Sequence, residues 1–205
     1  MLVVIDCYFK ALTETMRRIP SQDIEAVVQV LFAAWKNDAR VFIMGNGGSA
    51  STAAHFACDL AKATITKGKK RFRVQSLVDN VPLVSAWTND HGFGSIFAEQ
   101  LEPWLETGDV LIGISVHGGS GSGEAGPWSQ NLVRAVRLAR RRGAKVVGLS
   151  GFDGGLLKEE ADACVVVPVS AEPFGTPLVE SLHVAVHHLI CLALRQKIAG
   201  GALKV

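Results

Sequence analysis

The stretch Val41-Phe42-Ile43-Met44-Gly45-Asn46-Gly47-Gly48-Ser49 passes from a short apolar run into a glycine-rich turn, and residues 49–62 then return to helix-forming types. A continuous apolar run of this length is typical of a strand buried on both faces. Glycines permit the sharp reversal that joins such a strand to a helix. The stretch therefore predicts a strand, a tight turn and a helix, which is the repeating unit of a parallel α/β sheet.

The same strand pattern recurs further along the chain. Buried strands that alternate with helices predict an α/β fold, a three-layer αβα sandwich with a mostly parallel sheet between two layers of helices. The other apolar, strand-like runs lie at residues 72–77, 110–115, 145–150 and 164–169.

Helical spacing of apolar residues marks both ends of the chain. Two N-terminal helices are predicted, and Ser21 is the expected N-cap of the second. The last predicted helix is mostly apolar but carries several histidines. The predicted helices outside the first repeating unit cover residues 3–17, 22–37, 131–142 and about 177–197.

Size and composition favour one cytoplasmic domain. We expect residues 1–37 to be a helical extension and residues 38–198 to be the α/β core of a single domain of 205 residues. The apolar runs fall short of the roughly 20 residues that span a bilayer, and we see no export signal, so no membrane is expected. The formal charge is only +2, and the basic clusters have no aromatic residues between them, which excludes an obvious nucleic-acid surface. Four widely spaced cysteines are expected to be buried free thiols.

Two loops are candidates for phosphate binding. The first loop, residues 45–49, follows a predicted strand and opens a helix, where free backbone N–H groups and the helix dipole attract anions. The second loop, residues 115–120, follows another predicted strand and reads Ser-Val-His-Gly-Gly-Ser. A glycine-rich turn alone is also common in ordinary strand-to-helix connections. The two loops together favour a phosphate ligand, and the absence of a Gly-Lys-Ser/Thr sequence favours a monophosphate over a nucleotide.

Two predicted helices carry side chains suited to acid–base or metal chemistry. His55 and Asp59 are four residues apart, so they project from the same helix face. The last helix carries a second polar group within an apolar segment, and Glu180 and His187 align better by spacing than Glu180 and His188. Imidazole and carboxylate groups suit zinc, but they equally suit general acid–base catalysis, or the histidines are satisfied core residues. The polar residues of the last helix are Glu180, His183, His187 and His188.

These motifs resemble the sugar isomerase (SIS) domain family, in particular its sedoheptulose 7-phosphate isomerases. The resemblance covers nearly the whole chain, and it implies a five-stranded parallel sheet of the flavodoxin or Rossmann type. It also implies a homotetramer with active sites between subunits. The implied reaction is conversion of sedoheptulose 7-phosphate to D-glycero-D-manno-heptose 7-phosphate through an enediol. The motifs are residues 45–50, 55–60, 89–93, 108–115 and 151–155, and the histidines at 183 and 188.

The resemblance also implies roles for particular residues. Asp59 would be the catalytic base and His188 its acid–base partner. One zinc ion, found in some members, would be held by His55, Asp59, Glu180 and His188, with no nucleotide cofactor. The implied phosphate ligands are Ser49, Ser115 and Ser120, and the other substrate-binding residues are Asn46, Gly47, Gly48, Asn89, Asp90, His117 and Glu180.

The chain departs from the usual family pattern at four places. Asp59 stands where Glu is usual, Glu180 stands where Gln is usual, and residues 115–120 replace the usual Ser-Thr-Ser-Gly-Asn-Ser. Residues 121–128 look like an insertion in the second loop, so either Ser120 or Ser129 could take the role of the last loop serine. Two alternatives follow, which are a non-catalytic SIS protein that senses a sugar phosphate or binds another protein, and an SIS isomerase for another phosphorylated sugar. The histidine at position 188 favours retained chemistry.

Overall fold

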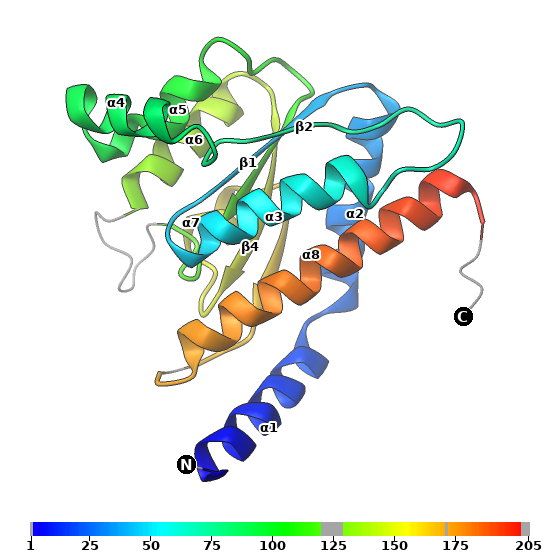
Figure 1. Cartoon of the computed structure of the whole chain (residues 1–205), viewed down its shortest axis with the longest axis vertical. Helices are drawn as coiled ribbons and strands as arrows, with labels where there is room; N and C mark the ends of the chain where they lie inside the picture. The colour runs from blue at the N-terminus through cyan, green and yellow to red at the C-terminus, as the bar shows by residue number, and fades with distance from the viewer. Residues whose placement is uncertain (1, 120–128, 171, 202–205) are drawn as a thin grey trace.

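Five parallel strands form one sheet in the computed structural model of the chain (Figure 1). The structure describes residues 2–119, 129–170 and 172–201. Neighbouring strands follow the order β2-β1-β3-β4-β5, and this order confirms the predicted five-stranded parallel sheet. The strands are β1 (Arg40–Gly45), β2 (Arg73–Ser76), β3 (Val110–Ile114), β4 (Lys145–Gly151) and β5 (Ala163–Val167).

Helices precede, connect and follow the strands. The predicted helices at both chain ends and after β1 and β3 are confirmed. Three helices were not predicted, because α4 buries no side chain and α5 and α7 are only 6 residues long. The helices are α1 (Leu2–Arg18), α2 (Ser21–Lys36), α3 (Gly48–Lys62), α4 (Val81–His91), α5 (Ile96–Leu101), α6 (Gln130–Arg141), α7 (Gly155–Glu160) and α8 (Gly175–Ala199), with a 3-10 turn, η1, at Phe93–Ser95.

Two details of the sequence prediction were wrong. Ser21 is the first residue of α2, and Pro20 takes the N-cap position without a side-chain hydrogen bond. The described cysteines are free, but Cys7 and Cys58 are exposed because they lie on outward faces of α1 and α3.

The sheet separates two apolar cores, as the three-layer prediction requires. Side chains along β1 alternate between the faces, so Val41 and Ile43 pack into the core beneath α2, α3 and α8. Phe42 and Met44 point the other way, into the core beneath α5, α6 and α7. Both faces of the sheet are therefore covered, and the two candidate loops follow the carboxyl ends of β1 and β3.

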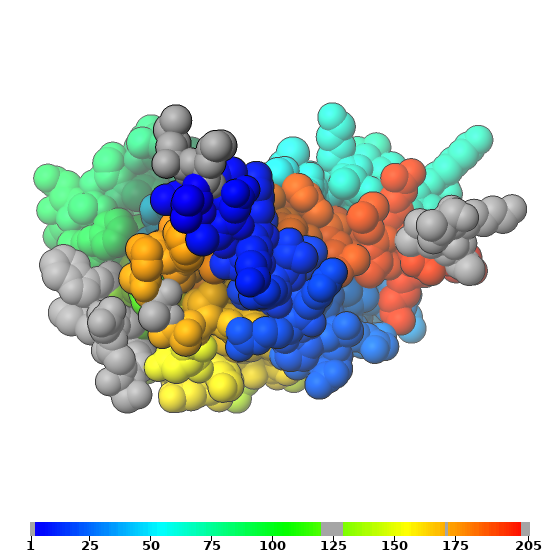
Figure 2. All heavy atoms as spheres, turned by 90° about the horizontal axis from the view of Figure 1, so that it is seen from below, coloured from blue at the N-terminus to red at the C-terminus, as the bar shows by residue number. Residues whose placement is uncertain are grey.

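The α2 helix belongs to this body, whereas α1 lies on its outside. Four α2 side chains are buried, and the helix packs against α8 and β5. The α1 helix projects from the body in Figure 1, and Figure 2 shows it on the surface beside the start of α8. It is held there through Tyr8, whose hydroxyl donates to the Pro177 carbonyl oxygen at 3.2 Å and lies 2.9 Å from Ser181 Oγ. Only the first of the two N-terminal helices is thus an appendage.

The α8 helix is long and apolar enough to cross a membrane by composition alone, but half of its apolar window is buried inside the protein. It packs against α2 and α3, and its buried side chains belong to one of the two cores. These contacts are those of a core helix. The same helix carries the polar residues of the candidate site.

Candidate functional site

The direction in which successive strands are added to the sheet reverses between β1 and β3. Both candidate loops lie at that point. The chain passes from β1 outward to β2 and returns to place β3 on the other side of β1. Open α/β sheets bind ligands at such a switch point, outside the carboxyl ends of the strands. Gly45 and Ile114 are register partners at these ends. The first and second loops therefore begin side by side.

The first loop requires glycine for two different reasons. Gly47 has a φ of 55°, which favours glycine. A Cβ at Gly45 would overlap the backbone carbonyl of Ser49, and a Cβ at Gly48 would overlap the Glu180 carboxylate. The loop thus turns sharply into α3. The N–H groups of Ala50 and Ser51 donate to loop carbonyls, whereas those of Gly48 and Ser49 have no backbone acceptor among the described residues. This arrangement suits a phosphate group.

A partly buried amide pair ties the first loop to α6. Asn46 Nδ2 donates to Asn131 Oδ1 at 3.0 Å, and Asn131 Nδ2 donates back to Asn46 Oδ1 at 2.8 Å. Asn131 is fully buried at the start of α6. Sequence reasoning selected Asn46 but missed Asn131, because nothing near position 131 indicated that α6 begins beside the first loop.

The described part of the second loop is packed on β4 and the turn that follows it. The N–H of Ser115 donates to the Leu149 carbonyl at 3.0 Å, and Ser115 Oγ accepts from the N–H of Gly119 at 3.3 Å. The His117 ring lies 4.5 Å from the Phe152 ring between centroids. Ser120 and the expected insertion at 121–128 lie outside the described residues.

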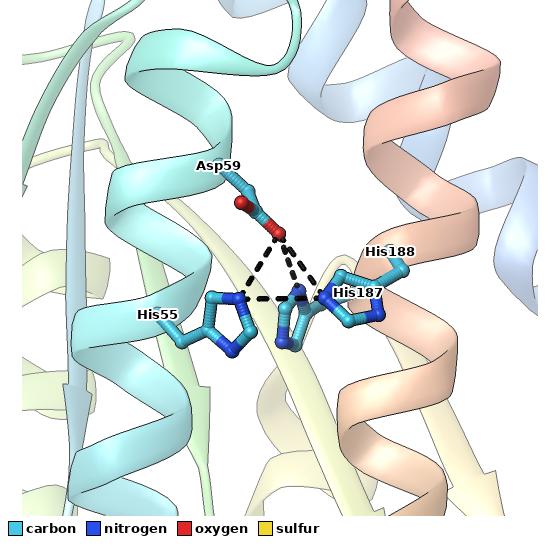
Figure 3. A group of neighbouring side chains, drawn as sticks. All are labelled: His55, Asp59, His187 and His188. Carbon is cyan, nitrogen blue, oxygen red and sulfur yellow. Dashed lines mark hydrogen bonds and ion pairs between the residues drawn. The ribbon is translucent and has the colours of Figure 1, made fainter.

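A four-residue cluster joins α3 to α8 (Figure 3). His55 and Asp59 come from α3, and His187 and His188 come from α8. Asp59 Oδ2 is the shared atom: it lies 3.6 Å from His55 Nε2, 3.5 Å from His187 Nδ1 and 3.4 Å from His188 Nε2. His55 Nε2 and His188 Nε2 are 3.4 Å apart. We call these four residues the His/Asp cluster.

The cluster is open to solvent on one side and buried on the other. The His55 and His188 side chains are each 47% exposed, whereas Asp59 is 19% exposed and His187 is fully buried. The Asp59 contacts with the three imidazoles go through Oδ2. A ligand can therefore reach the cluster from the solvent side, past His55 and His188.

The donor set fits a divalent metal ion. One nitrogen or oxygen atom from each member of the cluster lies within 4.8 Å of the others. The distances from Asp59 Oδ2 to the three imidazole nitrogens, and between the two exposed imidazole nitrogens, are 3.4–3.6 Å, longer than a good hydrogen bond. They are close to the spacing of about 3.4 Å between ligands around tetrahedral zinc, which follows from metal–ligand distances of about 2.0–2.1 Å. Imidazole and carboxylate are also ligands that zinc prefers.

The sequence profile of the SIS domain matches residues 7–151. The chain belongs to the SIS domain family. It is 38% identical over 162 residues to a phosphoheptose isomerase of Nitratiruptor, and the alignment covers 79% of each protein. The solved phosphoheptose isomerase of Neisseria gonorrhoeae has a TM-score of 0.79 and 25% identity, over 94% of this chain and 97% of that one. The resemblance found in the sequence is therefore confirmed.

A second relative differs in name and length. A lincomycin biosynthesis protein of Streptomyces lincolnensis is 52% identical over 168 residues, which is 82% of this chain. This SIS domain chain spans only 60% of that relative's length.

The structure brings together some of the predicted site residues and separates others. His55, Asp59 and His188 meet as expected, but Glu180 lies against Gly48 at the first loop and outside the His/Asp cluster. Asn89 and Asp90 lie on the exposed last turn of α4, where Asn89 Nδ2 donates to Asp90 Oδ1 at 2.7 Å. A cavity of about 180 Å³ beside the first loop is lined by residues of η1, α4 and α5 other than these two.

Burial keeps two histidines of this SIS domain neutral. Burial is the main cause that lowers the pKa of His187 to about 3, and repulsion between positive charges on this ring and on the neighbouring His188, His55 and His183 contributes to the same shift. Burial likewise lowers the pKa of His183 to about 4, although its hydrogen bond to the Ser150 carbonyl opposes the shift. A neutral imidazole is the form that binds a metal ion.

Proposed function

We propose that this chain is a phosphosugar isomerase that interconverts sedoheptulose 7-phosphate and D-glycero-D-manno-heptose 7-phosphate, or a close analogue, through an enediol. The observation that carries the proposal is the shared helix α3. Its N-terminus follows the first loop, and its third and fourth turns carry His55 and Asp59 of the His/Asp cluster. Relatives at 38% and 34% identity that are called phosphoheptose isomerases support the same assignment.

The phosphate group is proposed to bind the first loop. His55 lies six positions after Ser49, so the two residues are about 9 Å apart along the helix axis. An extended sugar bound by its phosphate at residues 47–49 and at Ser115 would therefore present its far carbons to the His/Asp cluster. The neutral amide pair of Asn46 and Asn131 holds this loop in place without competing for the anion.

Proton transfer is proposed to use Asp59 and His188. An aldose–ketose isomerisation needs a base that moves a proton between C1 and C2, and a second group that protonates and deprotonates the adjacent oxygens. The Asp59 carboxylate lies 3.4 Å from His188 Nε2, and the His188 side chain is half-exposed, so both groups can meet a substrate that enters from solvent. A divalent ion, when bound, would polarise the substrate carbonyl and hydroxyl.

Assembly and location are proposed from the same resemblance. Leu189 and Leu192, which follow His188 on α8, are 49% and 55% exposed. Apolar surface beside a half-open cluster supports an assembly in which another subunit covers the site. By the resemblance, this assembly is proposed to be a cytoplasmic homotetramer.

A different phosphorylated sugar is the second candidate substrate. The 52% identity with a protein of lincomycin biosynthesis favours a sugar phosphate used in the synthesis of a natural product. A non-catalytic sensor is less well supported, because such a protein needs the phosphate loops but not His55, Asp59 and His188 together.

The substrate is tested by incubating the purified chain with ketose and aldose phosphates of five to eight carbons. Interconversion is followed by NMR, with sugars lacking the phosphate as controls. We expect conversion of at least one phosphorylated sugar of seven or more carbons. Binding without conversion across the panel would favour the sensor.

A further inference from the structure

We propose that His187 is the fourth ligand of a divalent metal site formed with His55, Asp59 and His188, and that Glu180 is not a ligand. The inference concerns the cluster of the proposed isomerase, and it rests on that proposal only for the use of the metal. It differs from the set implied by the family resemblance, which places Glu180 in the fourth position.

The surroundings of His187 carry the inference. His187 is fully buried, and neither ring nitrogen has a hydrogen-bond partner among the described residues. A buried polar atom without a partner costs about 1–3 kcal/mol. Nδ1 nevertheless faces Asp59 Oδ2 at 3.5 Å, toward the atoms of His55 and His188 (Figure 3). A cation at the centre of the cluster would satisfy this nitrogen.

Packing fixes the direction in which Nδ1 points. The His187 ring lies on the Phe56 ring, with centroids 5.2 Å apart and an angle of 22° between planes. The centroids of the His187 and His55 rings are 4.7 Å apart, and the angle between their planes is 74°. Phe56 is itself fully buried. The imidazole is therefore held in the orientation that a ligand needs, before any ion binds.

Glu180 has a different neighbour. The two glutamate oxygens lie at Gly48, where they fill the space that a Cβ would need. Glu180 lies seven residues before His187 on α8, about two turns toward the first loop. The carboxylate is thus free of the metal and lies beside the proposed phosphate site.

A hydrophobic role for His187 makes the opposite predictions. If the ring only filled space on Phe56, replacing it with an apolar side chain would leave metal binding unchanged. If it is a ligand, the same replacement would remove a quarter of the coordination sphere. The two roles are separated by measuring metal affinity directly, without any sugar.

The test compares His187→Leu with Glu180→Gln in the full chain. Stoichiometry is measured by elemental analysis, affinity by competition with a chromophoric chelator for Zn²⁺, and geometry by the visible spectrum of bound Co²⁺. We expect about one equivalent in the wild-type chain. His187→Leu should weaken affinity at least about 100-fold and change the Co²⁺ spectrum, whereas Glu180→Gln should stay within about threefold.

Folding is controlled by thermal unfolding of the metal-free proteins. The metal-free His187→Leu variant should melt no lower than the metal-free wild type, because the substitution removes two unpartnered nitrogens. His187→Ile is the second variant if the first does not fold, since it is also apolar, has no donor atom for a metal and differs from leucine only in shape. A wild-type chain that binds no metal, unchanged affinity in the His187 variant, or an equal loss in Glu180→Gln would each overturn the proposal. Because no sugar is present, none of these results depends on isomerase activity.

Discussion

His183 and His187 lie four residues apart on α8, both fully buried, yet they differ in their partners. The ring nitrogen Nε2 of His183 lies 3.1 Å from the Ser150 carbonyl oxygen, to which it donates when neutral. His187 has no such acceptor among the described residues and faces the cluster instead. The first histidine therefore joins α8 to β4, whereas the second is available to a ligand.

Acid should destabilise the fold through His183. In the unfolded chain this residue takes up a proton near its ordinary pKa of 6.5, but in the folded chain only near pH 4. Its contribution is fully present above about pH 6.5 and is lost as the pH falls toward 4, by about 3 kcal/mol in total. Urea unfolding of metal-free protein between pH 7 and pH 4.5 would measure this. His183→Gln, which keeps a donor for Ser150, should show a shallower pH dependence, and an equal slope would contradict the assignment.

Part of the site could be predicted at the residue scale. The i, i+4 spacing of His55 and Asp59 was enough to place them on one helix face. The choice between Glu180 and His187 could not be made from the last helix alone, because spacing describes rotation about one axis. Which side of α8 faces α3 depends on how the two helices pack. Asn131 was missed for the same reason, since its partner is 85 residues away.

At the scale of elements, the junction of β1 and α3 positions the proposed phosphate site. Its sequence signature is local, so the strand, turn and helix could be predicted closely. The connection between β2 and β3 could not, because α4 has no buried side chain to give an apolar period and α5 is short. Asn89 and Asp90, which lie on α4, are accordingly exposed rather than gathered at the loops.

Gly45→Ala should disturb this junction. The added Cβ would overlap the backbone carbonyl of Ser49, which cannot move without displacing the start of α3. We expect a loss of about 1–3 kcal/mol in the free energy of unfolding and at least about tenfold weaker binding of a sugar phosphate. Gly201→Ala is the matched control, because no other atom of the described residues lies within 4 Å of its Cβ position apart from its chain neighbours. Calorimetry would measure both quantities, and wild-type values for Gly45→Ala would show that the loop tolerates displacement.

At the scale of the whole molecule, α1 carries a group of exposed apolar side chains on the outside of the α/β body. Val3, Val4, Ile5 and Phe9 on α1 are 46–72% exposed. The sequence grouped both N-terminal helices as one extension, but α2 is part of a core. The periodicity of a helix does not reveal whether its apolar face meets its own chain or another one.

Sedimentation velocity should show a homotetramer at micromolar concentration. Phe9→Asp should weaken assembly because it places a charge on the apolar face of α1, where Phe9 is 60% exposed. The neighbouring change Lys10→Asp should leave assembly intact, since Lys10 lies on a polar part of the helix and is exposed. A monomeric wild-type chain would contradict the proposal that another subunit covers the His/Asp cluster.

The His/Asp cluster is proposed to move protons on a bound sugar phosphate. The decisive measurement is the incorporation of solvent deuterium at C1 of a ketose phosphate, or at C2 of the aldose formed from it, by NMR in deuterated water. We expect incorporation by the wild-type chain and by His183→Gln, and a loss of at least about 100-fold in Asp59→Asn. Exchange that is equal in Asp59→Asn, or absent in the wild-type chain with every sugar phosphate of the panel, would contradict this proposal.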